Sequence, residues 1–199
     1  MVHKPMILTI SGALGSGKST IAKALAKVLK YNHYSTGDLM RAMATERGMT
    51  LLELSRIAEN DKSIDEELDA RQVKLGKDQD NFVIDGRLSW HFIPHSVKIF
   101  LDVSDEVAAK RIFKDQTRGV EKENLSLDKT LENIKTRRQS EIKRYNEYYG
   151  LNYYEKGNYD IVVNTDPLDV KGVLRDVLEK LSIMGKFDKD RIEEALNII

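Results

Sequence analysis

The sequence predicts an α/β fold in which a five-stranded parallel sheet is flanked by helices. Short apolar runs alternate along the chain with longer amphipathic stretches, which is the pattern of repeated strand–helix units. At 199 residues, the chain has the length of one sizeable domain. The first apolar run leads directly into a glycine-rich segment that opens a helix, an order typical of a phosphate-binding loop.

Five short segments are predicted to be strands, and helices connect them in a doubly wound arrangement. The predicted strands are Met6–Ile10, Asn32–Ser35, Phe82–Ile84, Val97–Leu101 and Ile161–Val163. The helix after the first strand is indicated by apolar residues at helical spacing, such as Ile21, Leu25 and Val28. Helices are predicted over residues 18–30, 37–47, 51–59, 64–75, 106–114 and 127–149, with a late helix from Asp166-Pro167 to near Leu181.

Two inserts and a C-terminal extension complete the predicted organisation of a single domain over residues 1–199. A helical insert occupies about 36–80, where Gly48-Met49-Thr50 provides a helix stop and an N-cap. A short lid occupies about 112–127 and includes a polar, glycine-containing loop. In the extension, 182–199, Asp188 is the expected N-cap of a terminal helix. One face of that helix is expected to pack on the core through Ile192, Ala195, Leu196 and Ile199.

Composition excludes several classes of function. Lys plus Arg and Asp plus Glu both number 32, so the formal net charge is zero and no global attraction to nucleic acid is expected. The absence of cysteine excludes disulfides, thiol catalysis and cysteine-ligated zinc. No apolar run approaches the ~18 residues of a membrane-spanning helix, and no signal-peptide pattern follows Met1. We expect a cytoplasmic monomer that binds neither membranes nor nucleic acid.

A phosphate-binding loop is predicted where the chain fits G-x-x-x-x-G-K-[ST]. Its glycines let successive backbone N–H groups point toward a polyphosphate, and the following helix adds its N-terminal dipole. Lys18 is expected to bridge the β- and γ-phosphates of ATP, and Ser19 to ligate Mg²⁺. The loop alone does not separate a kinase from other nucleotide-dependent proteins, although no Asn-Lys-x-Asp motif is present. The predicted ATP-binding residues are Gly12, Ala13, Leu14, Gly15, Ser16, Gly17, Lys18, Ser19 and Thr20.

Two strand ends predict a second anion site. Thr36, Gly37 and Arg41 open a helix after the second strand, where a monophosphate could bind. The alternative is ordinary N-capping by Thr36 with a solvated Arg41. Asp85 ends the third strand and is expected to hold Mg²⁺ through water, while Arg87 grips the acceptor phosphate. The alternative for Arg87 is an arginine at the surface of a turn.

Cations on the long predicted helix could stabilise the moving phosphoryl group. Arg137 and Arg144 are seven residues apart and share a helix face with Glu141. Arg111 lies near the end of the preceding helix, next to the predicted lid. Phosphoryl transfer needs positive charge spread around the γ-group, which arginines on a closing lid can provide. The alternative is a solvated charged face, and that is the favoured interpretation for Arg118 and Arg138.

These residues together resemble the nucleoside monophosphate kinases, and most closely the short cytidylate kinases of the archaeal type. The resemblance runs over roughly residues 6–181 and is most specific in Asp85-Gly86-Arg87 and the Arg137/Arg144 pair. It implies that the catalytic residues are Lys18, Arg87, Arg137, Arg144 and Arg111. It implies that the acceptor is bound by Thr36, Gly37, Arg41, Asp65, Asp69, Arg71, Asp85, Arg87 and Glu141. It implies that Mg²⁺ is held by Ser19 and, through water, by Asp85 and Asp38.

The resemblance implies a P-loop NTPase fold with an insert that binds the nucleoside monophosphate. The implied reaction transfers the γ-phosphate of ATP to CMP or dCMP, giving ADP and CDP or dCDP. The stretch from Thr36 to Arg41 is closer to adenylate kinases, and Asp115 stands where the family often has a basic residue. AMP and UMP therefore remain alternative acceptors. An adenylate-kinase-like factor that binds ATP to regulate an assembly is the alternative from another class.

Overall fold

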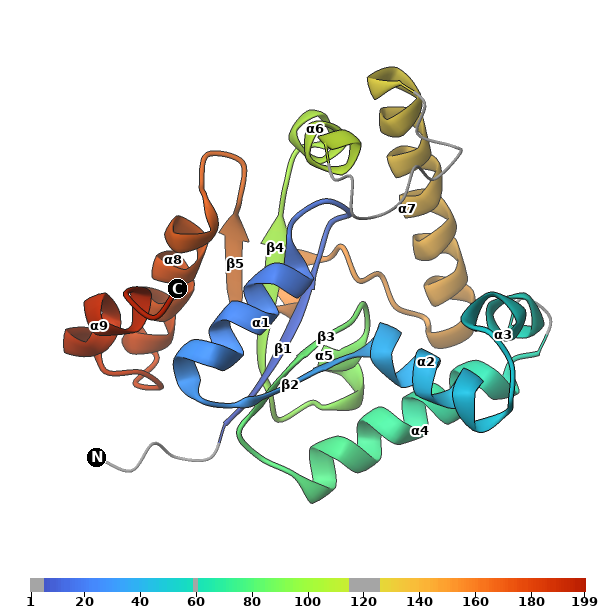
Figure 1. Ribbon diagram of the computed structural model, residues 1–199, viewed down its shortest axis with the longest axis horizontal. Helices are drawn as coiled ribbons and strands as arrows, with labels where there is room; N and C mark the ends of the chain where they lie inside the picture. Colours follow the sequence, from blue (N-terminus) through green and yellow to red (C-terminus); the bar gives the residue numbers. More distant parts are fainter. Residues whose placement is uncertain (1–5, 59–60, 115–125) are drawn as a thin grey trace.

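A five-stranded parallel sheet lies at the centre of the computed structural model, which describes residues 6–58, 61–114 and 126–199. Its strand order is β2-β3-β1-β4-β5 (Figure 1). The strands are β1 (Ile7–Gly12), β2 (Asn32–Ser35), β3 (Phe82–Asp85), β4 (Val97–Asp102) and β5 (Ile161–Asn164). Each predicted strand is present, and the prediction of a five-stranded parallel sheet with flanking helices is confirmed.

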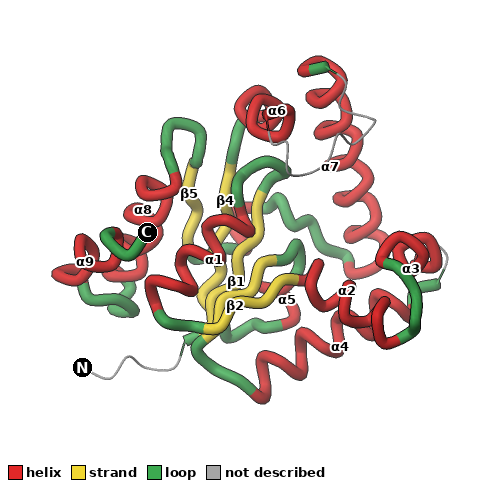
Figure 2. The backbone as a smooth tube through the Cα atoms, in the orientation of Figure 1, coloured by secondary structure: helices red, strands yellow, loops and turns green. Residues whose placement is uncertain are grey.

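The strand register brings separate parts of the sequence to one edge of the sheet. The central strand β1 lies between β3 and β4, so the chain crosses to opposite sides of it (Figure 2). In parallel pairing, Ser35 of β2 is opposite Asp85 of β3, which is opposite Ile10 of β1. The carboxyl ends of these strands therefore meet beside the loop after β1. Ligands of open α/β sheets bind at such a point, where the strand order reverses.

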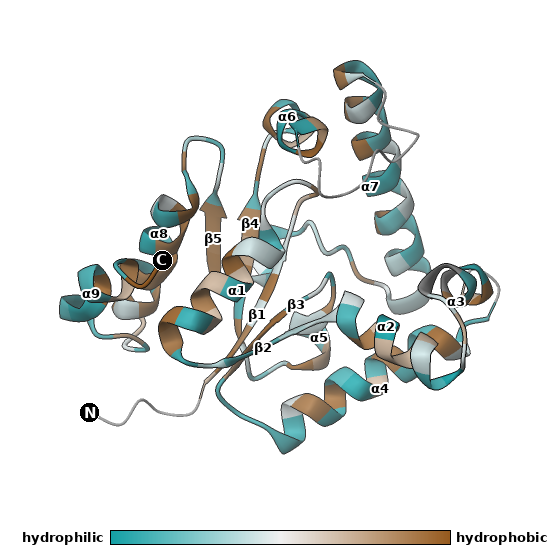
Figure 3. Cartoon of the chain, viewed as in Figure 1, coloured by the Kyte–Doolittle hydropathy of each residue, from teal (hydrophilic) through white to brown (hydrophobic). Residues whose placement is uncertain are grey.

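Alternate residues of the buried strands face two separate cores. Leu8 and Ile10 pack with α1 (Lys18–Leu29) and α8 (Val170–Ile183). Ile7 packs on the opposite face with Phe82 and Ile84. This period of two is the normal consequence of strand geometry, and burial of these side chains is the main stabilising contribution. In Figure 3 the hydrophobic colour follows the strands, while the long outer helices carry hydrophilic residues on their exposed sides.

Residues 36–80 contain three helices that lie beside the β2–β3 edge of the sheet: α2 (Thr36–Glu46), α3 (Leu51–Ala58) and α4 (Ser63–Asp78) (Figure 1). They share a small core that includes Met43, Leu54 and Ile64. Thr50 caps α3 as predicted, because its Oγ1 accepts from the Glu53 N–H at 3.2 Å. The Glu53 carboxylate accepts in return from the Thr50 N–H at 2.7 Å, which completes a capping box.

Two helices lie near the carboxyl edge of the sheet: α6 (Asp105–Lys114) and α7 (Leu127–Tyr149). Arg138 joins them through a two-point ion pair with Asp105, at 2.7 and 2.9 Å. This pair assigns Arg138 a structural role. The polar loop of the predicted lid, including Asp115 and Arg118, lies outside the described residues. No helix in the described ranges is long and apolar enough to cross a membrane.

The chain after β5 differs from its prediction. Helix α8 begins at Val170, where Asp169 caps it, and not at Asp166-Pro167. Asp166 is used instead in the preceding turn, because its carboxylate accepts from the Ser104 N–H at 2.8 Å. This contact keeps the segment after β5 outside the helix. The turn is therefore available to line a pocket beside α1.

The C-terminal extension contains a shorter helix than predicted. Asp188 caps a 3₁₀ turn over Lys189–Arg191, and α9 (Ile192–Leu196) follows it. Ile192, Ala195 and Leu196 join the main core, as predicted for the apolar face. Ile199 does not, because it lies beyond the end of α9 and remains 39% exposed.

Candidate active site

The loop between β1 and α1 forms a concave turn of backbone at the carboxyl edge of the sheet. Gly15 has φ of 74°, and a Cβ at this position would lie 2.9 Å from the Ala108 Cα. A larger residue would therefore be strained and would collide with α6. The Lys18 ammonium donates to the carbonyls of Gly12 at 3.2 Å and Ala13 at 3.3 Å. This places the lysine charge over the loop, where the predicted ATP-binding residues gather.

Ser16 provides a test of whether this loop fits a polyphosphate. Its side chain is 2% exposed, and its Oγ is the one buried side-chain polar atom of the described residues without a hydrogen-bond partner. A buried hydroxyl without a partner costs about 1–3 kcal/mol. A phosphate oxygen would accept its hydrogen bond, and the N-terminus of α1 favours the same negative charge. The loop residues therefore fit a polyphosphate.

Oxygen ligands suited to Mg²⁺ lie next to the loop. The Ser19 hydroxyl donates to Asp85 Oδ2 at 2.8 Å, which joins the start of α1 to the end of β3. Hydroxyl, carboxylate and water oxygens are the ligands that Mg²⁺ prefers. His33 of β2 contacts the other carboxylate oxygen, with 2.8 Å between Nε2 and Asp85 Oδ1. These residues fit the predicted metal. The histidine was missed, and only the register of β2 against β3 could have revealed it.

Asp38 lies apart from that pair, on the first turn of α2. Its pKa is lowered, first by the hydrogen bond from Arg41 and next by that from Ser35. Ser35 also caps α2 by accepting from the Asp38 N–H at 3.0 Å, so the alternative N-cap, Thr36, is wrong. The Arg41 guanidinium folds over the helix start, 3.7 Å from the position that a Gly37 Cβ would take. Arg41 and Gly37 therefore lie together at the helix start, and the second anion site stays a prediction.

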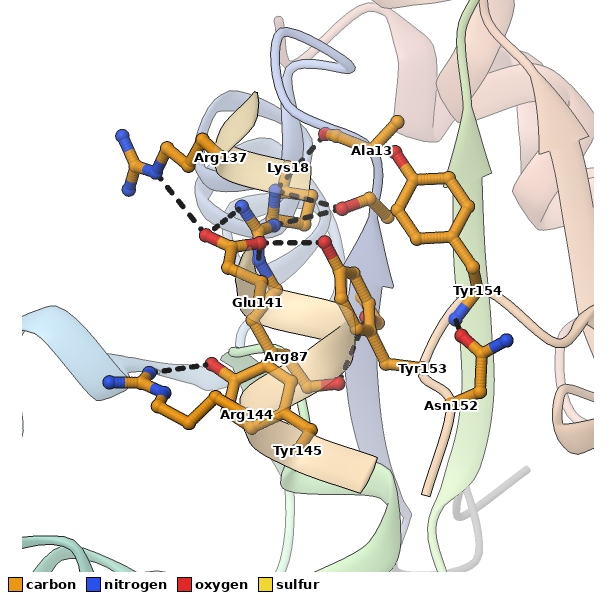
Figure 4. A network of polar contacts seen from close by, with 12 residues as sticks. Ala13, Lys18, Arg87, Arg137, Glu141, Arg144, Tyr145, Asn152, Tyr153 and Tyr154 are labelled. Carbon is orange, nitrogen blue, oxygen red and sulfur yellow. Dashed lines mark hydrogen bonds and ion pairs between the residues drawn. The ribbon is translucent and has the colours of Figure 1, made fainter. Parts of the chain in front are cut away.

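Arg87 forms the centre of a polar network behind the loop (Figure 4). Its Nε donates to Glu141 Oε2 at 2.9 Å, and its second terminal nitrogen reaches Oε1 at 3.4 Å. Its first terminal nitrogen donates to the Gly12 carbonyl at 2.9 Å. Arg87 and Glu141 are only 14% and 13% exposed. The alternative of a surface arginine is therefore wrong, and the pair joins α7 directly to the phosphate-binding loop.

Tyr153 contacts both members of the Arg87–Glu141 pair. Its fully buried ring lies 5.3 Å from the Arg87 guanidinium carbon, and its hydroxyl donates to Glu141 Oε2 at 2.6 Å. Burial opposes ionisation of Glu141, but the Arg87 charge and the tyrosine hydrogen bond hold the glutamate pKa below its ordinary value. Glu141 is consequently a carboxylate at neutral pH. No sequence pattern predicts this polar contact of Tyr153, because Tyr153 lies beyond the end of α7.

The two arginines of α7 flank Glu141, as their spacing predicts (Figure 4). Arg137 donates to Glu141 Oε1 at 3.3 Å and remains 60% exposed. Arg144 lies over the Tyr145 ring at 5.1 Å and donates to its hydroxyl at 3.3 Å. The structure therefore places Arg87 and Arg137 on the Glu141 carboxylate, whereas Arg144 bonds to Tyr145 on the next turn of α7.

Arg111, which the sequence grouped with Arg137 and Arg144, is not part of this cluster. Its guanidinium donates to the Thr165 hydroxyl at 2.9 Å and to the Thr165 carbonyl at 2.7 Å. It thereby borders a pocket of about 300 Å³ between the start of α1 and the turn before α8. The pocket is lined by Ser16, Gly17, Thr20, Ile21, Arg111, Thr165, Leu168, Asp169, Val170 and Val173. A flat apolar group attached to a polyphosphate in the loop would fit here.

Two acidic residues of α4 face α7, whereas Arg71 does not. Asp69 accepts from the Tyr149 hydroxyl at 2.6 Å, and burial raises the Asp69 pKa to about 6. Burial also raises the pKa of Asp65, although the charge of Arg144 opposes that change. Arg71 instead forms ion pairs with Glu46 and Glu67, toward α2. Arg71 therefore lies apart from Asp65 and Asp69, and its role in binding the acceptor stays a prediction.

Gly86 connects Asp85 to Arg87 where no side chain fits. A Cβ at this position would lie 2.4 Å from both Ser89 Oγ and Thr36 Cγ2. We expect Gly86→Ala to lower the free energy of unfolding by about 1–3 kcal/mol, because the crowded backbone must shift. Chemical denaturation measures this loss. Gly157→Ala is the matched control, since a Cβ there meets no atom within 4 Å. Equal stability of the two variants would contradict the close approach of Thr36 to Gly86.

Comparisons with known proteins agree with this geometry. Residues 7–167 match the Cytidylate kinase-like family. A cytidylate kinase of Methanobrevibacter smithii is 35% identical over 179 residues, covering 90% of this chain and all of the relative. A cytidylate kinase of Natronomonas pharaonis is 40% identical over 170 residues, covering 84% of this chain and 85% of the relative.

Solved structures confirm the fold at low sequence identity. A shikimate kinase from Bacteroides thetaiotaomicron is 14% identical with a TM-score of 0.65, covering 92% of this chain and 99% of its own. An uncharacterized protein from Eubacterium ventriosum has the same TM-score at 20% identity, over 92% of this chain and 99% of its own. The fold is thus that of P-loop kinases, and the long sequence match is more specific. The chain belongs to the cytidylate kinase-like family.

Proposed function

We propose that this protein transfers the γ-phosphate of ATP to CMP or dCMP, giving ADP and CDP or dCDP. One observation carries the proposal. Arg87 joins the phosphate-binding loop at Gly12 to Glu141, so a second cationic site directly adjoins the first. A protein that only hydrolyses ATP has no need of this second site. The relatives named above as cytidylate kinases support a nucleoside monophosphate as its ligand.

The donor side is built from the loop, α1 and the pocket at Arg111. Ser16 and the loop N–H groups would bind the phosphates, and Lys18 would leave the carbonyls it contacts to meet the β- and γ-phosphates. The adenine would occupy the pocket that Arg111 borders. Mg²⁺, when bound by Ser19 and by Asp85 through water, neutralises charge on the phosphate oxygens. Asp38, whose carboxylate accepts from Ser35 and Arg41, would contact the metal through water.

The acceptor side is built from α2, α4, α7 and the start of α5 (Ser89–Phe92). Arg41 and Arg87 would bind the acceptor phosphate, with Thr36 and Gly37 at the same helix start. Arg137 and Arg144 would surround the moving group, and the exposure of Arg137 leaves it accessible. Glu141 would orient the arginines and contact the acceptor nucleoside. Catalysis then consists of alignment and charge stabilisation, without a covalent enzyme intermediate.

A coupled assay of diphosphate formation tests the proposal against a panel of monophosphates. We expect turnover to be fastest with CMP or dCMP. Fastest turnover with AMP or UMP would keep the reaction class and change the acceptor. Intact ATP binding without turnover of any acceptor would overturn the kinase and favour an ATP-dependent assembly factor.

The donor pocket makes a separate prediction. Arg111→Ala should raise the KM for ATP by about 10-fold, because the pocket loses a wall and its tie to Thr165. The KM for CMP should change little. Steady-state kinetics with each substrate varied in turn measures both values. A larger effect on the acceptor KM would contradict the placement of Arg111 on the donor side.

Partners and setting follow from the same proposal. We expect ATP, Mg²⁺ and a monophosphate to be the ligands required, with the protein acting as a cytoplasmic monomer. Light scattering at assay concentrations measures the oligomeric state, and a dimer would contradict this expectation.

A further inference from the structure

A chain of hydrogen bonds joins three helices through the middle of α4. The Ser89 hydroxyl donates to Gln72 Oε1 at 2.7 Å, where both side chains are buried. Gln72 Nε2 donates to Asp69 Oδ1 at 3.4 Å, and the Tyr149 hydroxyl donates to Asp69 Oδ2 at 2.6 Å. The chain therefore runs from α5 through α4 to α7.

Gln72 is 2% exposed, which is unusual for a residue of its type. Burying its amide is costly unless both ends are bonded, and Ser89 and Asp69 bond one end each. Because the serine donates to Oε1, the amide NH₂ faces Asp69. Gln72 and Tyr149 therefore both donate to Asp69, as expected for a carboxylate that only accepts hydrogen bonds. Each carboxylate oxygen has a second lone pair for another donor.

The place of Asp69 along the site indicates what that donor is. Tyr149 follows Glu141 by eight residues on α7, a rise of about 12 Å. Arg144 lies between Glu141 and Tyr149 on this helix. Burial lowers the pKa of Arg144, but Tyr145 and the charges of Asp65 and Glu141 raise it above its ordinary value. A monophosphate bound at Arg87 would thus extend its nucleoside past Arg144 toward Asp69. The base, not the ribose, would reach the aspartate.

We propose that Tyr149, Gln72 and Ser89 are positioning residues that hold Asp69 as an acceptor for the exocyclic amino group of the acceptor base. This inference rests on the proposed function and deepens it. Cytosine offers N4–H₂ as a donor, whereas uracil has a carbonyl oxygen at the same place. A carboxylate there accepts from the first and repels the second. The site therefore selects CMP over UMP.

The protonation state of Asp69 gives this selection a pH dependence. Burial raises the Asp69 pKa to about 6, Tyr149 opposes the change, and Asp65 and Glu66 reinforce it. These are the titratable groups that face Asp69 from α4 and α7. At pH 8 the carboxylate is ionised and accepts hydrogen bonds. As the pH falls below 6 it becomes protonated and can donate to uracil, so the preference for CMP should shrink.

The test measures kcat/KM for CMP and for UMP, and their ratio, from pH 5.5 to 8. Asp69→Asn should lower the ratio at pH 8 by about 10- to 100-fold and remove its pH dependence. Tyr149→Phe and Gln72→Met should lower the ratio less and shift its midpoint to higher pH, because each removes a donor to the carboxylate. A residue needed only for packing would not move that midpoint. Asp78→Asn, at an exposed position of the same helix, is the matched control.

Isothermal titration of CMP and UMP measures the same preference without turnover. A protein that prefers CMP in binding but transfers no phosphate would therefore contradict the proposed function and uphold this inference. An unchanged ratio in Asp69→Asn, with wild-type stability, would overturn the inference alone. Equal affinity of the wild-type protein for CMP and UMP would also overturn it. Tyr149→Phe preserves the ring packing and serves if Asp69→Asn fails to fold.

Discussion

Lys18→Ala should abolish transfer to every acceptor, with kcat lowered by about 10³-fold. The lysine charge lies over the loop carbonyls of Gly12 and Ala13, where it is poised for the β- and γ-phosphates. Loss of a preorganised charge that stabilises a transition state typically costs 10²–10³ in rate. The measurement is the coupled assay at saturating ATP and acceptor.

The fold of Lys18→Ala should remain intact, because alanine is an excellent helix former at the start of α1. Its melting temperature should stay close to that of the wild-type protein. Lys23→Ala removes an exposed lysine from the same helix and provides the matched control with full activity. Wild-type rates in Lys18→Ala would refute the assignment of the loop.

Arg87→Ala should impair both stability and use of the acceptor. The variant leaves Glu141 largely buried without its main cationic partner, which we expect to cost about 3 kcal/mol of unfolding free energy. The KM for CMP should rise by about 10- to 100-fold, because a charged hydrogen bond to the phosphate is lost. The KM for ATP should change far less. Denaturation and steady-state kinetics measure the two effects separately.

Two further variants separate the roles of Arg87. Arg87→Met combined with Glu141→Leu removes both charges, so stability should recover while transfer does not. Arg138→Ala also breaks an ion pair of α7, with Asp105, but on the α6 side. It should therefore lower stability without raising the acceptor KM. A rise in the KM for ATP that exceeds the rise for CMP would assign Arg87 to the donor side.

The phosphate-binding loop and the strands could be predicted because their patterns are local. The residues from Gly12 to Ser19 carry their own geometry in glycines and a helix start. The strands follow from short apolar runs, and the prediction of Asp85 at a strand end needed no knowledge of its neighbours. The spacing of Arg137, Glu141 and Arg144 likewise fixes a shared helix face.

The separation of Arg71 from Asp65 and Asp69 could have been predicted from the sequence. Arg71 follows Asp69 by two residues, and positions two apart on a helix point in nearly opposite directions. The helical period therefore already separates Arg71 from Asp65 and Asp69. Its pairing with Glu46 across α2 follows from that direction.

The remaining contacts depend on residues far apart in the chain. His33 meets Asp85 only because β2 pairs beside β3, and Arg111 meets Thr165 because α6 packs near the turn after β5. Arg87 and Glu141 are 54 residues apart, and no local pattern predicts their pairing.

The sequence by itself determined a parallel α/β kinase fold, a phosphate-binding loop and a set of arginines suited to a second nucleotide. The tertiary structure alone decided where each arginine lies: Arg87 beside the loop, Arg111 against Thr165 and Arg71 in an ion pair. The physical reason is that backbone patterns arise from neighbours in the chain. The environment of a charge arises from whatever the fold packs against it.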